Sequence, residues 1–173
     1  ESGTLAGGTG AGKSNTGYQG TGYADFGGLG SSAEYTFTRT SAGTADISFR
    51  YANGAGAARP LQILINGVLV GTIDCAPTGG WTTWKTITLS DVALPSGTVK
   101  LKAIASTATG GANLDQIVIG DGTTVTPPDP DPDPDPDPDP DPTDAITLEA
   151  ELAMLSGGAV KATNHTGRSE EHT

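Results

Sequence analysis

Seven consecutive Asp-Pro pairs, at residues 129–142, divide the sequence into two unequal parts. Proline fixes the backbone angle φ and has no amide hydrogen, so this run can join neither a helix nor a sheet. Like charges at every second residue repel one another, and fourteen residues of polyproline II helix would span roughly 43 Å. We therefore predict a domain over residues 1–122, an extended linker over 123–144, and the truncated start of a second domain over 145–173.

The net charge of −11 belongs mostly to this linker. Residues 1–126 contain eight acidic and seven basic residues, so the first domain is nearly neutral. The acidity therefore says little about a binding face. No basic stripe is present that could release counterions from phosphates, and we expect no nucleic-acid partner.

The sequence after the linker repeats the beginning of the chain. Residues 151–158 (ELAMLSGG) align without a gap with residues 1–8 (ESGTLAGG), and Thr166-Gly167 then falls on Thr16-Gly17. Glu, Leu, Gly-Gly and Thr-Gly at fixed offsets indicate an internal repeat. The second copy covers only about 30 residues, too few to bury a core, and we expect it to be loosely ordered.

Apolar residues alternate with polar ones along much of the first domain, which is typical of half-buried strands. The alternating sets are Tyr35 and Phe37; Ile47, Phe49 and Tyr51; Leu61, Ile63 and Ile65; Val68 and Val70; Ile87 and Leu89; Val99, Leu101 and Ala103; and residues 114–119. The Asn66-Gly67 pair predicts a tight hairpin turn, and Asp91 is expected in a turn. The pattern predicts an all-β fold, an antiparallel β-sandwich or jelly roll.

Neither the phosphate-loop pattern nor the histidine and carboxylate residues of the sequence support a catalytic site. Residues 7–14 (GGTGAGKS) satisfy the phosphate-loop pattern, but they follow only a short strand and precede a glycine-rich segment where a helix is needed. A flexible surface loop is expected there instead. The only histidines, His165 and His172, lie in the incomplete repeat, and no spacing pairs two carboxylates for glycoside hydrolysis. The chain is therefore not expected to be an enzyme by itself.

Cysteine and hydropathy place few further limits on the chain. Cys75 is the only cysteine, so no intrachain disulfide can form. No apolar run approaches the roughly 20 residues that a membrane span needs, and we expect no membrane partner. The chain begins at Glu1 rather than Met, and we interpret it as a fragment whose export signal could lie upstream.

Several motifs in sequence order resemble carbohydrate-binding module family 35, with the related family 6 as the nearest alternative. They are residues 20–26 (GTGYADF), 50–54 (RYANG), 59–61 (RPL), 66–67 (NG), 78–84 (TGGWTTW), 94–97 (LPSG), 111–115 (GANLD) and 146–151 (ITLEAE). Together they extend over nearly all of residues 1–120. The resemblance implies a jelly-roll sandwich that binds plant cell-wall sugars, appended to a secreted bacterial glycoside hydrolase or esterase.

The resemblance also implies a structural calcium ion, with a calcium ion at the ligand site as a further option. Glu1 from the N-terminal strand and Asp115 from the C-terminal strand would meet at the metal, which needs several hard oxygen ligands. Asp115 stands in an otherwise apolar strand, and this favours a partner for its carboxylate. An ordinary surface acid is the alternative.

For the sugar, the resemblance implies ligand loops at one end of the sandwich. Tyr23, a tryptophan and Asn113 would contact the pyranose, with Arg59 added if the sugar is a uronic acid. Trp81 and Trp84 are both candidates for stacking on the sugar, and the strand alternation does not decide between them. For either tryptophan, a structural role in the core fits the sequence as well as contact with the sugar does. Tyr18 is a looser candidate, and Asn113 is the principal one.

We thus expect a monomeric, non-catalytic binding module within a multidomain extracellular protein. Its targets would be uronic acid-containing glycans, xylan, mannan or galactan of the plant cell wall. Tethering would raise the effective concentration of an attached catalytic domain at the polysaccharide. The alternative is a structural or adhesion sandwich of a cell-surface protein that binds no sugar; an indole exposed at a loop end would separate the two.

Overall fold

A computed structural model describes residues 2–120 and 146–149 of the chain. Within these ranges the backbone forms strands and no helix, and hence no helix that could cross a membrane. The strands are β1 (Ser2–Ala6), β2 (Gly10–Gly12), β3 (Tyr23–Asp25), β4 (Ser32–Arg39), β5 (Gly43–Ala52), β6 (Leu61–Ile65), β7 (Val68–Ile73), β8 (Trp84–Leu94), β9 (Gly97–Ala105), β10 (Asn113–Gly120) and β11 (Ile146–Glu149).

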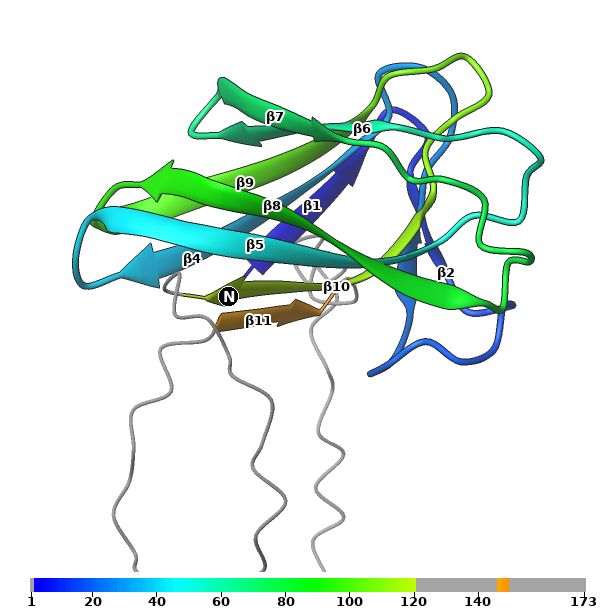
Figure 1. The fold of residues 1–173 in the computed structure, drawn as a ribbon, viewed down its shortest axis with the longest axis horizontal. Helices are drawn as coiled ribbons and strands as arrows, with labels where there is room; N and C mark the ends of the chain where they lie inside the picture. Colours follow the sequence, from blue (N-terminus) through cyan, green and yellow to red (C-terminus); the bar gives the residue numbers. More distant parts are fainter. Residues whose placement is uncertain (1, 121–145, 150–173) are drawn as a thin grey trace, which may run out of the picture.

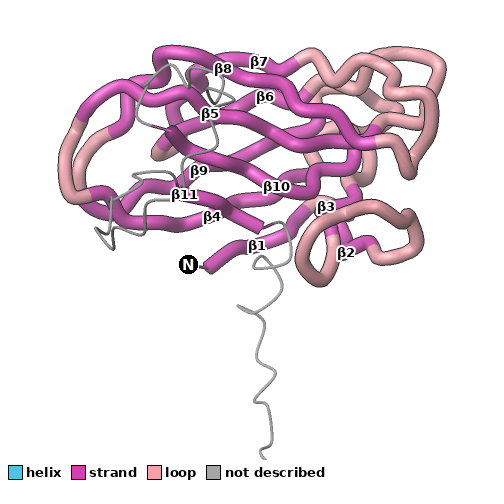
Figure 2. Tube along the Cα trace, turned by 60° about the horizontal axis from the view of Figure 1, so that its bottom comes forward, coloured by secondary structure: helices cyan, strands magenta, loops and turns pink. Residues whose placement is uncertain are grey.

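The strands form two antiparallel sheets that pack face to face (Figure 1). Sheet A has the order β1-β4-β9-β6-β7, and sheet B has the order β2-β3-β10-β5-β8, with β11 added on β10. Most of the long loops gather at one end of the sandwich, on the right in Figure 2. We call this the loop end. The sandwich predicted from the alternating pattern is confirmed.

The core lies between the two sheets and is built from the inward-facing residues of the predicted strands. Ile47, Phe49 and Ile63 are wholly buried, and Leu101 and Ile117 join them from β9 and β10. Alternation in sequence therefore corresponds to alternation between core and outer face. The predicted hairpin turn is also confirmed, since Asn66 and Gly67 have φ of 48° and 82° between β6 and β7.

The prediction that Asp91 lies in a turn is wrong. It lies inside β8, at a bulge where the pairing with β5 shifts register between Ala45 and Ile47. Its φ of 56° and a hydrogen bond from its backbone N–H to Asp46 Oδ1, 3.0 Å long, accommodate the extra residue. Asp and Pro nearby are compatible with a bulge as well as with a turn.

The segment that carries the phosphate-loop pattern is more ordered than the expected surface loop. Gly7 and Gly8 form a turn with φ of 65° and 90°, and Gly10–Gly12 form the edge strand β2, paired with β3. No helix follows this segment, so the amides that a phosphate would need are not assembled.

Part of the predicted second repeat belongs to the first domain's sheet. Ile146–Glu149 form β11, which pairs with Gln116–Ile119 of β10. The predicted linker and the other residues of the second repeat lie outside the described residues, so the expectation that this repeat is loosely ordered stays a prediction.

Candidate functional site

The described residues proposed for sugar and metal binding fall into two clusters. One lies on the outer face of sheet B and comprises Tyr23, Trp84 and Asp115 together with Arg50, which contacts both Trp84 and Asp115; we call it the sheet-face cluster. The other lies at the loop end and comprises Arg59, Trp81 and Asn113; we call it the loop-end cluster. Glu1 lies outside the described residues.

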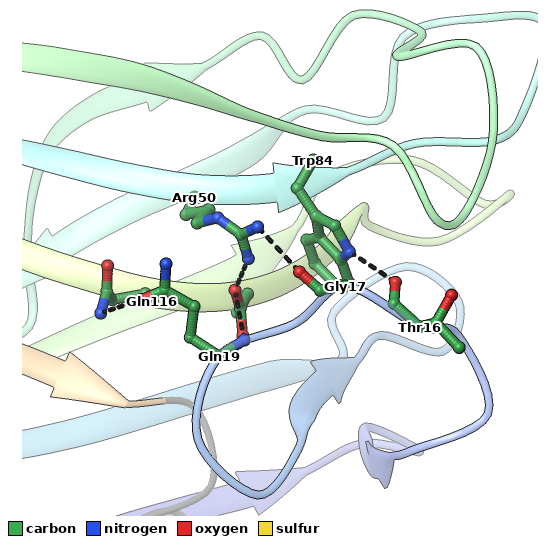
Figure 3. Close-up of polar contacts among 7 residues, drawn as sticks. Thr16, Gly17, Gln19, Arg50, Trp84 and Gln116 are labelled. Carbon is green, nitrogen blue, oxygen red and sulfur yellow. Dashed lines mark hydrogen bonds and ion pairs between the residues drawn. The ribbon is translucent and has the colours of Figure 1, made fainter.

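Trp84 is committed to contacts within the protein. Its Nε1–H donates a 2.9 Å hydrogen bond to the carbonyl of Thr16, which lies in the loop of residues 13–22 (Figure 3). The guanidinium carbon of Arg50 lies 5.1 Å from its ring centroid, within cation–π range. The Tyr23 ring meets it edge to face with centroids 5.5 Å apart. The indole thus fastens the 13–22 loop onto sheet B.

Tyr23 is nearly as fully engaged, with only 1% of its surface exposed. Its hydroxyl accepts hydrogen bonds from Asn15 Nδ2 at 2.7 Å and from the Asn15 backbone N–H at 3.3 Å. The ring packs at 5.7 Å from that of Tyr18 and lies so close to Gly12 that a Cβ there would come within 2.2 Å of it. Tyr23 is therefore buried between β2 and the 13–22 loop.

Asp115 finds its partner in Arg50. The Asp115 carboxylate is fully buried and forms an ion pair with Arg50 Nη1. It also accepts hydrogen bonds from the Gln19 backbone N–H, at 3.0 and 3.2 Å to its two oxygens. Arg50 Nη2 reaches the Gly17 carbonyl at 2.8 Å, and Gln116 Nε2 donates to the Gln19 side chain at 3.1 Å (Figure 3). These contacts anchor the 13–22 loop at several points.

As placed, Asp115 does not fit a calcium ligand. Its negative charge is already balanced by a guanidinium, and a cation at the same oxygens would have to displace Arg50. Among the described residues, no group of three or more acidic, histidine or cysteine side chains gathers at one point. Calcium prefers several oxygen ligands at once. At this site the described residues provide a single carboxylate, that of Asp115, and it is already paired with Arg50.

Arg59 and Trp81 lie against each other at the loop end. The Arg59 guanidinium carbon is 5.1 Å from the Trp81 ring centroid, and Arg59 Nη1 donates to the carbonyl of Gly111 at 3.3 Å. Arg59 Nε is buried and has no hydrogen-bond partner among the described residues. Gly54 lies directly under the indole, because a Cβ at this position would come within 2.5 Å of it.

Asn113 begins β10, two residues after Gly111, and pairs with Ala52 of β5. Its surface is 2% exposed, but its amide is not among the buried polar atoms of the described residues that lack a hydrogen-bond partner; in this cluster, that atom is Arg59 Nε. A buried N–H without a partner costs about 1–3 kcal/mol. Arg59 Nε is therefore expected to meet water or a ligand.

Sequence reasoning missed the residue that shapes the loops of this cluster. Asn53 is fully buried, and its Nδ2 donates to the carbonyls of Ala57 at 2.9 Å and Cys75 at 2.7 Å. Its backbone N–H donates to Thr78 Oγ1 at 3.0 Å. Asn53 thereby joins the loop that carries Arg59 to the loop that carries Trp81. An asparagine directly before a glycine, at the end of an alternating strand, was the available sign.

Comparison with known proteins identifies the fold and the broad role. Residues 1–121 match the family described as carbohydrate binding module (family 6). The chain belongs to this family. Modules of this kind bind carbohydrate and carry no catalytic machinery of their own, so the predicted binding module is confirmed.

Solved family 35 modules are also similar to the chain. One from Cellvibrio japonicus is 33% identical with a TM-score of 0.65, and the match covers 71% of this chain and 90% of that one. Another, in complex with a disaccharide containing glucuronic acid, is 32% identical with a TM-score of 0.59, covering 71% of this chain and 95% of that one. The predicted kinship with families 35 and 6 is confirmed.

Among curated proteins, an exo-β-D-glucosaminidase from Amycolatopsis orientalis is 45% identical over 91 residues, 52% of this chain. The match covers only 9% of that enzyme's length. The similarity therefore concerns a module of the enzyme and not the whole protein.

Proposed function

We propose that this carbohydrate-binding module holds its sugar at the loop-end cluster. The observation that carries the proposal is Arg59 Nε, which is buried and has no hydrogen-bond partner among the described residues, close to the segment that leads to Asn113. A sugar oxygen can accept from this N–H, and a sugar hydroxyl can both donate to and accept from the Asn113 amide. Trp81 adds apolar surface for the carbon–hydrogen face of a pyranose, and Arg59 adds a positive charge.

By the same reasoning, Tyr23 and Trp84 are positioning residues rather than ligands of the sugar. The Trp84 N–H and the Tyr23 hydroxyl are already used to hold the 13–22 loop. A sugar that took these groups would have to break contacts that fasten the loop. This reasoning favours Trp81 as the tryptophan that contacts the pyranose.

We further infer that the preferred ligand is an acidic sugar. Arg59 lies beside both Trp81 and the segment leading to Asn113, and a guanidinium pairs well with a carboxylate. A solved family 35 relative binds a disaccharide containing glucuronic acid, which supports this choice. A cationic amino sugar would be repelled by the same arginine. Uronic acid-capped oligosaccharides should therefore bind more tightly than neutral ones, and glucosamine oligomers least.

The role in the parent protein follows from tethering. We propose that the module keeps an attached, secreted glycoside hydrolase or esterase close to plant cell-wall polysaccharide. Binding through the module raises the effective concentration of the catalytic domain at its substrate. The family 6 match and the relative among glycoside-cleaving enzymes support this role.

The sugar site is tested by retention on a polysaccharide affinity gel. Asn113→Ala should lower affinity at least about tenfold, which corresponds to about 1.4 kcal/mol of lost hydrogen bonding. Asn15→Ala is the matched control, because it removes a side-chain amide of the same kind from the 13–22 loop, where that amide donates to Tyr23 of the sheet-face cluster. If the Asn15→Ala variant no longer binds the gel while the Asn113→Ala variant binds it as the wild type does, the sugar lies on the outer face of sheet B instead.

The calcium ion implied by the family resemblance stays a separate proposal. It depends on Glu1, outside the described residues, and on Asp115, which pairs with Arg50. An ion that binds only the folded state raises its stability, so a chelator would lower the melting temperature. An unchanged melting temperature after chelation would indicate that Arg50, and not a metal ion, balances the charge of Asp115.

A further inference from the structure

One buried hydroxyl ties together two loops of the loop-end cluster. Thr78 is 6% exposed and lies in the loop of residues 74–83, between β7 and β8. Its Oγ1 accepts a 3.0 Å hydrogen bond from the backbone N–H of Asn53, which follows β5. In return, the Thr78 backbone N–H donates to the Asn53 carbonyl at 2.8 Å. The two loops are therefore joined by a reciprocal pair of hydrogen bonds.

The hydroxyl proton of Thr78 has two carbonyl acceptors within reach. The carbonyl of Gly80 lies at 2.9 Å and that of Asn53 at 3.1 Å. Asn53 already accepts from the Thr78 backbone N–H, so the shorter bond to Gly80 adds the contact that is otherwise missing. A hydroxyl donates one proton and accepts through its lone pairs. One side chain can thus hold Asn53 and Gly80 at the same time.

The two residues that Thr78 holds directly precede the two that meet at the indole. Gly54 follows Asn53, and Trp81 follows Gly80. A Cβ at Gly54 would lie 2.5 Å from Cδ1 and 2.6 Å from both Cγ and Nε1 of Trp81. Nearly equal distances to three ring atoms place Gly54 over the face of the pyrrole ring and not beside its edge. The Thr78 hydroxyl therefore fixes the chain on both sides of this contact.

Arg59 is tied to the same two loops through its backbone. The carbonyl of Cys75 accepts from the Arg59 N–H at 3.1 Å and from Asn53 Nδ2 at 2.7 Å, which uses both of its lone pairs. Asn53 Nδ2 also donates to the carbonyl of Ala57 at 2.9 Å. The positions of Arg59 and Trp81 are therefore both set by hydrogen bonds that meet at Asn53.

We propose that Thr78 is a positioning residue for the sugar site, which sets Trp81 relative to Arg59 without touching the sugar. Sites built on loops are less precise than sites on strands, unless surrounding hydrogen bonds lock the side chains that contact the ligand. Both contacting groups of this site lie on or directly beside loops. The inference rests on the proposed function, in which Trp81 and Arg59 contact the sugar. Loss of the hydroxyl should weaken binding without removing the site.

Isothermal titration with a disaccharide containing glucuronic acid tests the inference. Thr78→Val keeps the size of the side chain and removes the hydroxyl, and we expect its Kd to rise about three- to tenfold. Thr78→Ser keeps the hydroxyl and should bind as the wild type does. A merely structural role would lower the folded fraction, and with it the stoichiometry, at an unchanged Kd. Should the valine variant fail to fold, Thr78→Ala removes the same hydroxyl and carries the same test.

Thr9→Val is the matched control. It makes the same substitution at another buried threonine, between β1 and β2, whose hydroxyl has no hydrogen-bond partner among the described residues. Its Kd should stay unchanged, and an equal rise in both variants would overturn the specific role of Thr78. An unchanged Kd in Thr78→Val overturns it as well. If Asn113→Ala weakens binding in that case, the sugar site itself stands; if neither variant changes the Kd, the proposed site falls too.

Discussion

The ion pair between Arg50 and Asp115 offers the sharpest test of how the outer face of sheet B is built. The Asp115 side chain is 0% exposed and that of Arg50 22% exposed, so removing the guanidinium leaves a buried carboxylate without its countercharge. Breaking a buried pair on one side costs about 3–5 kcal/mol. The backbone N–H of Gln19 still donates to Asp115, so we expect Arg50→Met to lie near the lower end, about 3 kcal/mol.

Thermal unfolding followed by circular dichroism measures this effect. For a module of about 120 residues, 1 kcal/mol corresponds to roughly 4 °C, so the melting temperature should fall by about 10–15 °C. Adding Asp115→Asn to Arg50→Met removes the buried charge and should recover part of the loss, with a coupling energy of about 2 kcal/mol. Trypsin should also cleave after Lys13 faster in Arg50→Met, because the 13–22 loop has lost its anchor.

The reasoning fails if Arg50→Met costs less than about 1 kcal/mol, or if the two substitutions are additive. Either result would mean that Asp115 is stabilised mainly by something other than Arg50. A metal ion would then be the first alternative to examine, by repeating the melts with a chelator.

Three further predictions follow from single contacts. Gly54→Ala would place a Cβ within 2.5 Å of the Trp81 indole. We expect weaker sugar retention on an affinity gel and a loss of about 1–3 kcal/mol in the free energy of urea unfolding. Unchanged retention would argue against Trp81 as part of the site. Tyr23→Phe removes the hydroxyl that accepts from Asn15 and should cost about 0.5–1.5 kcal/mol while retention stays unchanged. Burial raises the pKa of the Cys75 thiol to about 12, so the native protein should resist labelling by a thiol reagent at pH 8. The free energy of unfolding should decline above about pH 9, because only the unfolded thiol ionises there. Rapid labelling of the native protein would contradict the burial.

The fold was largely predictable because alternation is a local property. Tyr35, Phe37 and most of their counterparts on the other strands are buried as the pattern requires, but Val68 at the start of β7 is 66% exposed. The bulge at Asp91 was not predictable, since its geometry depends on Asp46, which lies 45 residues earlier on the neighbouring strand. Local residue preference cannot distinguish a strand that ends from one that continues through a bulge.

The roles of the two tryptophans could not be read from sequence for a similar reason. Trp84 is fixed by the carbonyl of Thr16, 68 residues away, and Asp115 by Arg50, 65 residues away. Asp115 in an apolar strand correctly indicated that the carboxylate has a partner, but not which one. Only the fold brings the 13–22 loop over sheet B, and with it the distinction between Trp81 and Trp84.

The anchored 13–22 loop has a consequence for the shape of the ligand. It lies across the outer face of sheet B near the start of β8, so a long glycan cannot run flat along that face without crossing it. A sugar held at the loop end would then be approached from the tip of the sandwich, a geometry suited to a terminal or branching residue. Binding capacity should therefore scale with the number of chain termini in a polysaccharide preparation rather than with its mass, and partial digestion of the polymer should increase it.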